Sequence, residues 1–316
     1  MRAAKIFMRC SRLFSFALAC LLLTGASGCV PFPTVTGARE SLPLWPHGHP
    51  LTKGNTEYDI PRLFLFPAPE QGAKNTVVIV ASGGSYGHQG GLTFEGLSTV
   101  RWLNAHGITA ALLRYRVAEF GGYDYRAILD DATRAVQLLR RRAADAGGPT
   151  PHIGVIGFSA GGHLAGWLAT GHGQKLASAA LTADALSESS QVDFAIMVYP
   201  VVTLEPPYAH QRSRNNLLHG IDQPDDALIA SLSLENRVHA DQPPTLLIHS
   251  RRDAKVDFHN SLLFYEAAKK AGASAELLLF DDGGHGVGLS DAAEAPQMST
   301  WPEQSLAWMR RIGVLE

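Results

Sequence analysis

A regular alternation of short apolar segments with longer amphipathic ones constrains the fold of this chain more than any other feature. Apolar runs of strand length occur at residues 62–66, 76–81, 108–114, 152–158, 193–198, 245–249 and 275–280. Helix-like segments occur at residues 93–105, 125–143, 160–170, 258–271 and about 302–311. Within 125–143, Leu129, Ala132 and Val136 recur at spacings of three and four, which places them on one helix face. Strands that alternate with helices predict an α/β fold with a mostly parallel central sheet flanked by helices.

One stretch interrupts this alternation. Residues 203–240 are polar and contain Pro206, Pro207 and Pro224. In open α/β sheets the functional sites lie in the loops at the edge where the strands end. We therefore predict that residues 203–240 form a small insertion over this edge.

The N-terminal residues have the layout of a bacterial export signal. Four basic residues lie among the first twelve, the apolar run 13–23 follows, and small residues lead to Cys29. The apolar run is too short to span a bilayer. The small residues resemble a lipobox, although Ala26 stands where leucine is usual. We predict a signal peptide at 1–28 and a lipid on Cys29 that anchors the protein in the bacterial cell envelope, at the outer membrane. Cleavage by an ordinary signal peptidase, which would leave a periplasmic or secreted protein, is the alternative.

The remaining composition limits the domain organisation and the possible partners. Residues 30–60 are rich in proline and glycine and show no strand or helix period, so we predict a tether and lead-in at 29–60 and one α/β domain at 61–316. All three cysteines lie in the first 29 residues, which excludes disulfide or cysteine chemistry in that domain. A formal net charge of -2 provides no basic surface for nucleic acid. Nothing in the sequence indicates an oligomeric state.

The motif G-x-S-x-G occurs twice, and context separates the two copies. Residues 157–161 follow a strand-like run and precede a helix-like segment, which is the strand–turn–helix context in which this motif presents a serine nucleophile above a sheet. Residues 83–87 are followed by Gly90 and Gly91, which disfavour a helix. We predict Ser159 as the nucleophile, with a turn that serves only packing as the alternative, and Ser85 as a loop residue.

A serine nucleophile needs a histidine to accept its proton and a carboxylate to orient that histidine. When the motif lies on an α/β sheet, the acid and then the histidine follow the serine along the chain. His285 lies between glycines after the last predicted strand, and Asp253 follows the strand before it. We predict His285 as the base and Asp253 as the acid. Asp257 is the alternative acid, although it lies where an acidic side chain would cap the next helix.

The same chemistry needs N–H groups aimed at the negative oxygen of the tetrahedral intermediate. The residue after the nucleophile, Ala160, provides one, and the glycine-rich loop after an early strand provides the others. We assign these to the N–H groups of Gly84 and Ser85. No spacing typical of metal ligands occurs among the histidines, so neither a metal ion nor an organic cofactor is expected.

Taken in order, these residues resemble the α/β-hydrolase esterases of the acetyl-esterase/lipase type, in particular the bacterial BD-FAE-like carbohydrate esterases that act on acetylated or feruloylated xylan. The resemblance runs through residues 44–46, the glycine loop, 108–116, 157–165, 199–202, 233–238, 243–245 and 283–286. It implies an α/β-hydrolase fold with Ser159, Asp253 and His285 as the triad. The chain departs from the family pattern at Ser85, where the loop usually has a third glycine, and at Arg252 and Asp257, where an acidic residue and a proline are common.

These observations together predict a serine carboxylic-ester hydrolase that works through an acyl-enzyme. The resemblance implies short acyl (acetyl) or feruloyl esters of carbohydrate such as xylan as substrates. Two alternatives stay open, because a triad does not choose between water, amide and ester, and a fold does not prove activity. They are a serine peptidase or acyltransferase on the same fold, and a non-catalytic hydrolase-like lipoprotein that binds a carbohydrate or another partner.

Overall fold

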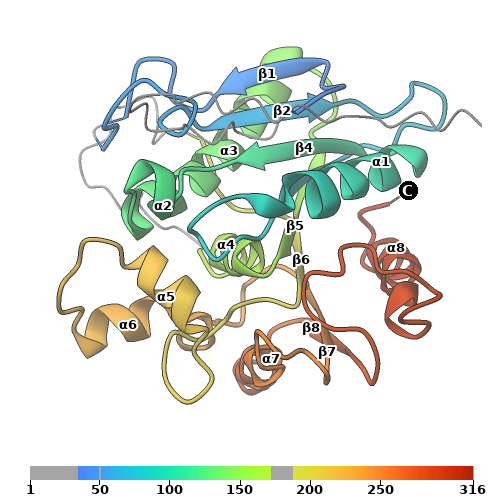
Figure 1. Cartoon of the computed structure of the whole chain (residues 1–316). Helices are drawn as coiled ribbons and strands as arrows, with labels where there is room; N and C mark the ends of the chain where they lie inside the picture. Colours follow the sequence, from blue (N-terminus) through green and yellow to red (C-terminus); the bar gives the residue numbers. More distant parts are fainter. Residues whose placement is uncertain (1–34, 50, 172–187, 316) are drawn as a thin grey trace, which may run out of the picture. The chain divides into compact units, whose positions relative to one another are not determined.

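In the computed structural model, which describes residues 35–49, 51–171 and 188–315, an eight-stranded sheet forms the middle layer (Figure 1). The strands are β1 (Glu40–Pro43), β2 (Arg62–Phe66), β3 (Thr76–Ala81), β4 (Thr109–Arg114), β5 (His152–Phe158), β6 (Phe194–Val198), β7 (Thr245–Ser250) and β8 (Ala275–Phe280). Their order is β1-β2-β4-β3-β5-β6-β7-β8. The pairs from β4 to β8 are parallel, and β2 is antiparallel to both β1 and β4. The predicted mostly parallel sheet is confirmed.

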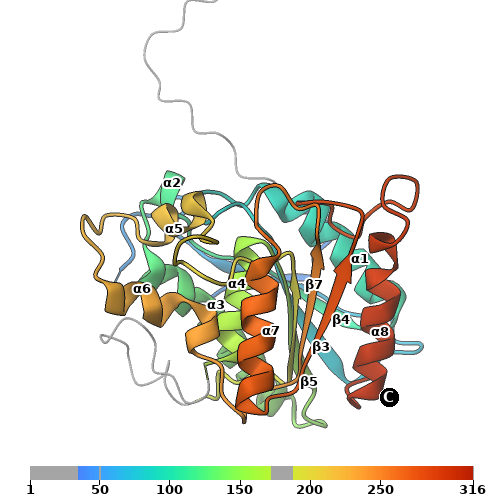
Figure 2. The ribbon, with the colours of Figure 1, turned by 90° about the horizontal axis from the view of Figure 1, so that it is seen from below.

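Helices cover both faces of the sheet. They are α1 (Ser98–Ala105), α2 (Ala118–Gly121), α3 (Tyr125–Ala146), α4 (Ala160–Ala169), α5 (Gln211–Leu217), α6 (Asp226–Leu232), α7 (His259–Ala271) and α8 (Trp301–Arg311). Figure 2 shows α3, α4 and α7 on one side of the sheet and α1 and α8 on the other. The predicted insertion contains α5 and α6, both too short to show a helical period in the sequence.

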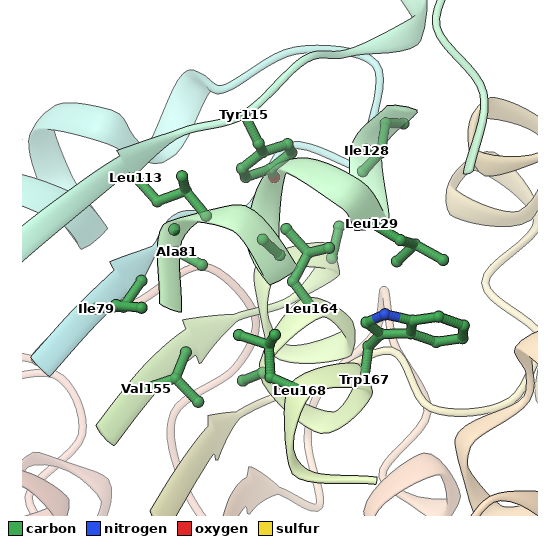
Figure 3. Packing of buried hydrophobic residues seen from close by; sticks show 14 of the residues in the cluster. Ile79, Ala81, Leu113, Tyr115, Ile128, Leu129, Val155, Leu164, Trp167 and Leu168 are labelled. Atoms are coloured by element: carbon green, nitrogen blue, oxygen red, sulfur yellow. The ribbon is translucent and has the colours of Figure 1, made fainter. Parts of the chain in front are cut away.

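Two buried clusters follow from the alternation of side chains along the strands. Ile79 and Val155 face α3 and α4, where they meet Leu129 and Leu164 (Figure 3). The neighbouring residues along each strand point to the opposite face, so that Ile156 packs with α1 and α8. Each fully buried side chain of this kind contributes about 1.5–3 kcal/mol through its removal from water. The sheet is therefore fixed from both sides, which gives the loops at its carboxyl edge a rigid base.

The predicted domain boundary at residue 61 lies too late in the chain. β1 pairs with β2 in the register Ser41 opposite Phe64, so part of the predicted 29–60 lead-in is an edge strand of the sheet. β1 has only four residues and is half-buried, which is too short for an alternating pattern to be visible. Just after β1, Trp45 Nε1 donates to Asp131 Oδ1 on α3 at 2.7 Å.

The carboxylate of Asp131 also forms a fully buried ion pair with Arg116, whose guanidinium lies 3.1 Å from Nδ1 of His49. These contacts attach the lead-in to the interior of the domain. The predicted signal at 1–28 and the predicted lipidation site Cys29 lie outside the described residues. In the part of the chain that the structure describes, none of the helices combines the length and apolar character that crossing a membrane requires.

Candidate active site

The predicted nucleophile lies on a tight turn between β5 and α4. Ser159 has φ 55° and ψ -117°, a backbone conformation that is strained for a residue with a side chain. The turn also brings α4 against the ends of the strands. A Cβ at Gly157 would overlap the carbonyl oxygen of Gly161, and a Cβ at Gly161 would overlap that of Ala81. The two motif glycines are therefore required by close approach of backbone to backbone.

The three residues predicted to act together meet at the carboxyl edge of the sheet. His285 Nε2 lies 2.9 Å from Ser159 Oγ, and His285 Nδ1 lies 2.7 Å from Asp253 Oδ2. Asp253 follows β7 and His285 follows β8, so three separate strand ends contribute one group each. A carboxylate at Nδ1 requires the ring proton there, which leaves Nε2 free to accept the hydroxyl proton of serine.

The carboxylate of Asp253 is fully buried and surrounded by donors. The backbone N–H groups of Lys255 and Val256 donate to Oδ1 at 2.9 and 3.0 Å, and His249 Nε2 lies 3.3 Å from Oδ2. Burial raises the pKa of Asp253, but hydrogen bonds with His249 and His285 outweigh burial and hold that pKa well below its usual value. Asp253 therefore stays ionised beside His285.

The alternative acid, Asp257, has a different role. Its Oδ1 accepts from the backbone N–H of His259 at 2.9 Å and contacts Nδ1 of the same residue at 2.7 Å. His259 is the first residue of α7, so the carboxylate caps the start of this helix. The geometry joins Asp253, and not Asp257, to His285.

The glycine loop after β3 faces the same cavity. Gly84 and Ser85 line a cavity of about 410 Å³ together with Ser159 and His285. Gly84 has φ 135°, and a Cβ there would overlap the carbonyl oxygen of His88, so only glycine fits. Ala160 is the first residue of α4, where a backbone N–H has no acceptor within the helix. The three predicted oxyanion donors thus belong to the two segments that border Ser159.

Glu95 is a part of the site that the sequence analysis missed. Its Oε2 accepts from the backbone N–H of Gly83 at 2.7 Å, and its Oε1 accepts from the hydroxyl of Tyr199 at 2.9 Å. The Tyr199 hydroxyl accepts from the N–H of Gly288 at 3.0 Å, and its ring centroid lies 4.9 Å from that of His285. One buried carboxylate therefore connects the glycine loop with the loop that carries His285.

The pKa of Glu95 is raised by burial, while the hydrogen bonds from Gly83 and Tyr199 and the charge of His285 oppose this shift. A signal for this residue does exist in the sequence. Glu95 is three residues after Leu92 and four before Thr99, so it lies on a face that is otherwise buried. A charged side chain at such a position indicates a specific partner.

A second buried pair of side chains, Tyr86 and His163, connects the glycine loop with α4. The hydroxyl of Tyr86 lies 2.8 Å from Nδ1 of His163, and Nε2 of His163 lies 2.8 Å from the carbonyl oxygen of Leu232. Burial lowers the pKa of His163 to about 4, which keeps the ring neutral. This chain joins the loop, α4 and α6, and does not reach Ser159. Across the described ranges, no group of three or more His, Cys, Asp or Glu side chains is arranged to hold a metal ion.

Comparisons with known proteins agree with this architecture. The BD-FAE family model matches residues 64–268. An acetylxylan esterase of Xylanibacter ruminicola is 28% identical over 198 residues, which make up 62% of this chain and 38% of the relative. This chain thus spans less than two fifths of the length of that relative.

Solved structures resemble the chain over more of its length. The crystal structure of an acetyl ester-xyloside bifunctional hydrolase from Caldicellulosiruptor lactoaceticus is 34% identical, with a TM-score of 0.76 over 88% of this chain and 97% of that one. An esterase of Thermogutta terrifontis, 22% identical with a TM-score of 0.69 over 89% and 96% of the two chains, shares the fold. The predicted α/β-hydrolase fold is confirmed by these neighbours.

Proposed function

Because the chain belongs to the BD-FAE family, we propose that it is a serine carboxylesterase that acts on short acyl esters, acetyl or feruloyl, of carbohydrates such as xylan. One observation carries this proposal. Ser159, His285 and Asp253 form a chain of contacts at 2.9 and 2.7 Å on a strained turn at the carboxyl edge of the sheet. The names of the similar proteins, an acetylxylan esterase and an acetyl ester-xyloside hydrolase, support the choice of substrate.

In the proposed reaction, Oγ of Ser159 attacks the ester carbonyl carbon while Nε2 of His285 takes the hydroxyl proton. The carbonyl oxygen becomes an oxyanion that accepts hydrogen bonds from the N–H groups of Gly84, Ser85 and Ala160. The bond to the alcohol oxygen then breaks, and His285 donates its proton to that oxygen.

The acyl group remains on Ser159 as an ester. Water attacks this acyl-enzyme while His285 takes a proton from the water, and the acid leaves as His285 returns a proton to Oγ. Throughout, the ionised carboxylate of Asp253 stabilises the positive ring of His285. Its low pKa suits this role, because a carboxylate that took up the ring proton could not hold the positive charge.

Ser159→Ala tests the nucleophile. We expect kcat on p-nitrophenyl acetate to fall by at least about a thousandfold and labelling by a fluorophosphonate probe to be lost. Ser231→Ala, at an exposed serine on α6, is the matched control and should keep both. Full activity in Ser159→Ala would refute the proposal. If the probe labels the wild type but the wild type does not hydrolyse esters, the peptidase or acyltransferase alternative is favoured. If the probe does not label the wild type, the non-catalytic binding protein is favoured.

The substrate class is tested separately with a panel of p-nitrophenyl esters of increasing chain length, acetylated xylan and methyl ferulate. A preference for long chains would remove the carbohydrate ester from the proposal. We further propose that Cys29 carries a lipid that anchors the enzyme in the cell envelope. Mass spectrometry of the mature N-terminus checks this, and an unmodified start at any other residue would refute it.

A further inference from the structure

An exposed phenylalanine lies at the edge of the candidate active site. Among the residues that the structure describes, the large hydrophobic side chains that are exposed are Phe94, at 56%, and Phe120, at 46%. Leaving a phenylalanine in water forgoes about 1.5–3 kcal/mol of burial. The ring of Phe94 packs closely on Gly288, where a Cβ would lie 2.9 Å from it. An exposed aromatic face beside a cavity is typical of a surface that binds a ligand.

Phe94 separates two cavities. One is the cavity of about 410 Å³ that contains Ser159 and His285, and the other is a larger one of about 800 Å³ beside it. Phe94 and Gly286 line both, so the two spaces adjoin at the residue that follows His285. Most residues that line the larger cavity belong to the loop between β8 and α8.

The larger cavity is lined by charged side chains as well as by the aromatic ring. Arg252, Asp291 and Glu294 line it, and one oxygen of Asp291, Oδ1, accepts from the backbone N–H of Ala293 at 2.8 Å. Asp282 lines it too, but its two oxygens accept from the backbone N–H groups of Gln297 and Met298. Carboxylates accept hydrogen bonds from hydroxyl groups and a guanidinium donates to them. A pyranose has both kinds of surface, an apolar C–H face and a rim of hydroxyls.

The direction of the proposed reaction decides which half of the substrate occupies this cavity. His285 donates its proton to the alcohol oxygen, so the alcohol must lie on the His285 side of the scissile bond. The larger cavity is lined by Gly283, Gly284 and Gly286, which flank His285. The acyl group then lies toward the glycine loop in the smaller cavity.

We propose that the larger cavity is a sugar subsite for the alcohol half of the ester, with a pyranose ring stacked on Phe94 and its hydroxyls bound by Arg252, Asp291 and Glu294. This inference rests on the proposed esterase function. It identifies the ligand as a neutral acylated pyranoside whose sugar extends away from Ser159 past His285. Phe94 acts in it as a specificity-determining residue.

Phe94→Ala tests the subsite by comparing two acetate esters. kcat/KM is measured for acetylated xylotriose and for ethyl acetate, and the ratio of the two values is compared among variants. We expect the ratio to fall about tenfold in Phe94→Ala, mainly through a higher KM for the sugar ester, because stacking stabilises bound substrate and transition state alike. Phe94→Trp keeps an aromatic face and should retain the ratio within about threefold.

Phe120→Ala is the matched control. Phe120 is exposed like Phe94, but it stacks on Tyr58 with ring centroids 5.1 Å apart and lines neither cavity. In Phe120→Ala the ratio of the two kcat/KM values should equal that of the wild type. An unchanged ratio in Phe94→Ala, or a ratio in Phe94→Trp as low as in Phe94→Ala, would overturn the subsite.

Two further measurements separate this inference from the proposed function. The first is the affinity of Ser159→Ala for unacetylated xylotriose, measured by calorimetry, which should weaken about tenfold when Phe94→Ala is added. This measurement needs no catalysis. Equal binding with and without Phe94 would overturn the subsite. A wild type that hydrolyses ethyl acetate at least as efficiently as acetylated xylotriose would also overturn it, while the esterase proposal would stand.

Discussion

Replacement of Glu95 tests whether the glycine loop must be held by a buried carboxylate. Glu95 accepts two hydrogen bonds, from the N–H of Gly83 and the hydroxyl of Tyr199. Glu95→Ala removes both acceptor oxygens. Glu95→Gln keeps the shape of the side chain but has only one acceptor oxygen. In Glu95→Gln the amide oxygen can keep Gly83, while its NH2 group meets the Tyr199 hydroxyl, which already accepts from Gly288. The hydroxyl proton of Tyr199 then has no acceptor.

These contacts determine how much the free energy of unfolding and kcat should change in the two Glu95 variants. One unsatisfied buried donor costs about 1–3 kcal/mol, so Glu95→Gln should lower the free energy of unfolding by about that amount. Glu95→Ala leaves two donors and a cavity, and should cost about 3–5 kcal/mol. The N–H of Gly83 precedes that of Gly84, a proposed oxyanion donor. Because losing one such donor outright reduces kcat by about a hundredfold or more, a loosened loop in Glu95→Ala should reduce kcat about ten- to a hundredfold.

The assay combines urea unfolding with kcat and KM on p-nitrophenyl acetate. Glu95→Gln keeps the bond to Gly83, so its kcat should stay within about threefold of the wild type. The two variants should therefore differ more in kcat than in KM. A folded Glu95→Ala with wild-type kcat, or equal kcat losses in both variants, would show that the loop does not depend on this carboxylate.

Three further predictions follow from the described contacts. Asp253→Asn should reduce kcat about ten-thousandfold, whereas Asp257→Asn should stay within about threefold, and a larger loss in Asp257→Asn than in Asp253→Asn in steady-state assays would reverse the assignment of the acid. Gly157→Ala should lower the free energy of urea unfolding by about 3 kcal/mol, whereas Gly148→Ala, whose Cβ would meet nothing within 4 Å, should leave it unchanged; equal stabilities would contradict the close approach at the turn. Burial lowers the pKa of His163 from 6.5 to about 4, so the unfolded chain binds more protons between these values and stability falls as the pH drops through them. His163→Gln should lose that part of the pH dependence, about 2–3 kcal/mol, and an unchanged slope in urea unfolding between pH 7 and pH 4.5 would show that His163 is not its source.

Most of the sheet could be predicted from the sequence because its central strands are buried on both faces. Such strands are continuous apolar runs between turn residues, and the observed β3 and β5 coincide with the predicted 76–81 and 152–158. Ser159, Asp253 and His285 could be found because each follows a strand in a fixed chain order. The structure brings them within hydrogen-bond distance, and their catalytic roles remain predictions.

The features that the sequence did not predict depend on contacts between distant segments. Glu95 and Tyr199 are 104 residues apart, and no local pattern connects a carboxylate with a hydroxyl at that separation. β1 exists because the edge of β2 provides its partner, not because its four residues favour a strand. Likewise, the helix predicted at 93–105 begins as a π-helical turn over Thr93–Leu97 before α1 starts. This turn carries both Phe94 and Glu95.

The attachment of the lead-in limits how far the chain can be shortened from its N-terminus. Trp45 and His49 contact the buried Arg116–Asp131 pair, and β1 covers the outer edge of β2. A fragment that begins at residue 61 would let water reach that ion pair and leave the backbone groups of β2 open to a strand from another molecule. Such a fragment would keep every residue of the proposed triad and still tend to aggregate. A fragment that keeps the sheet edge and the buried ion pair covered therefore starts before β1, and residues 40–49 set the practical limit for expression, fusion or immobilisation of the protein.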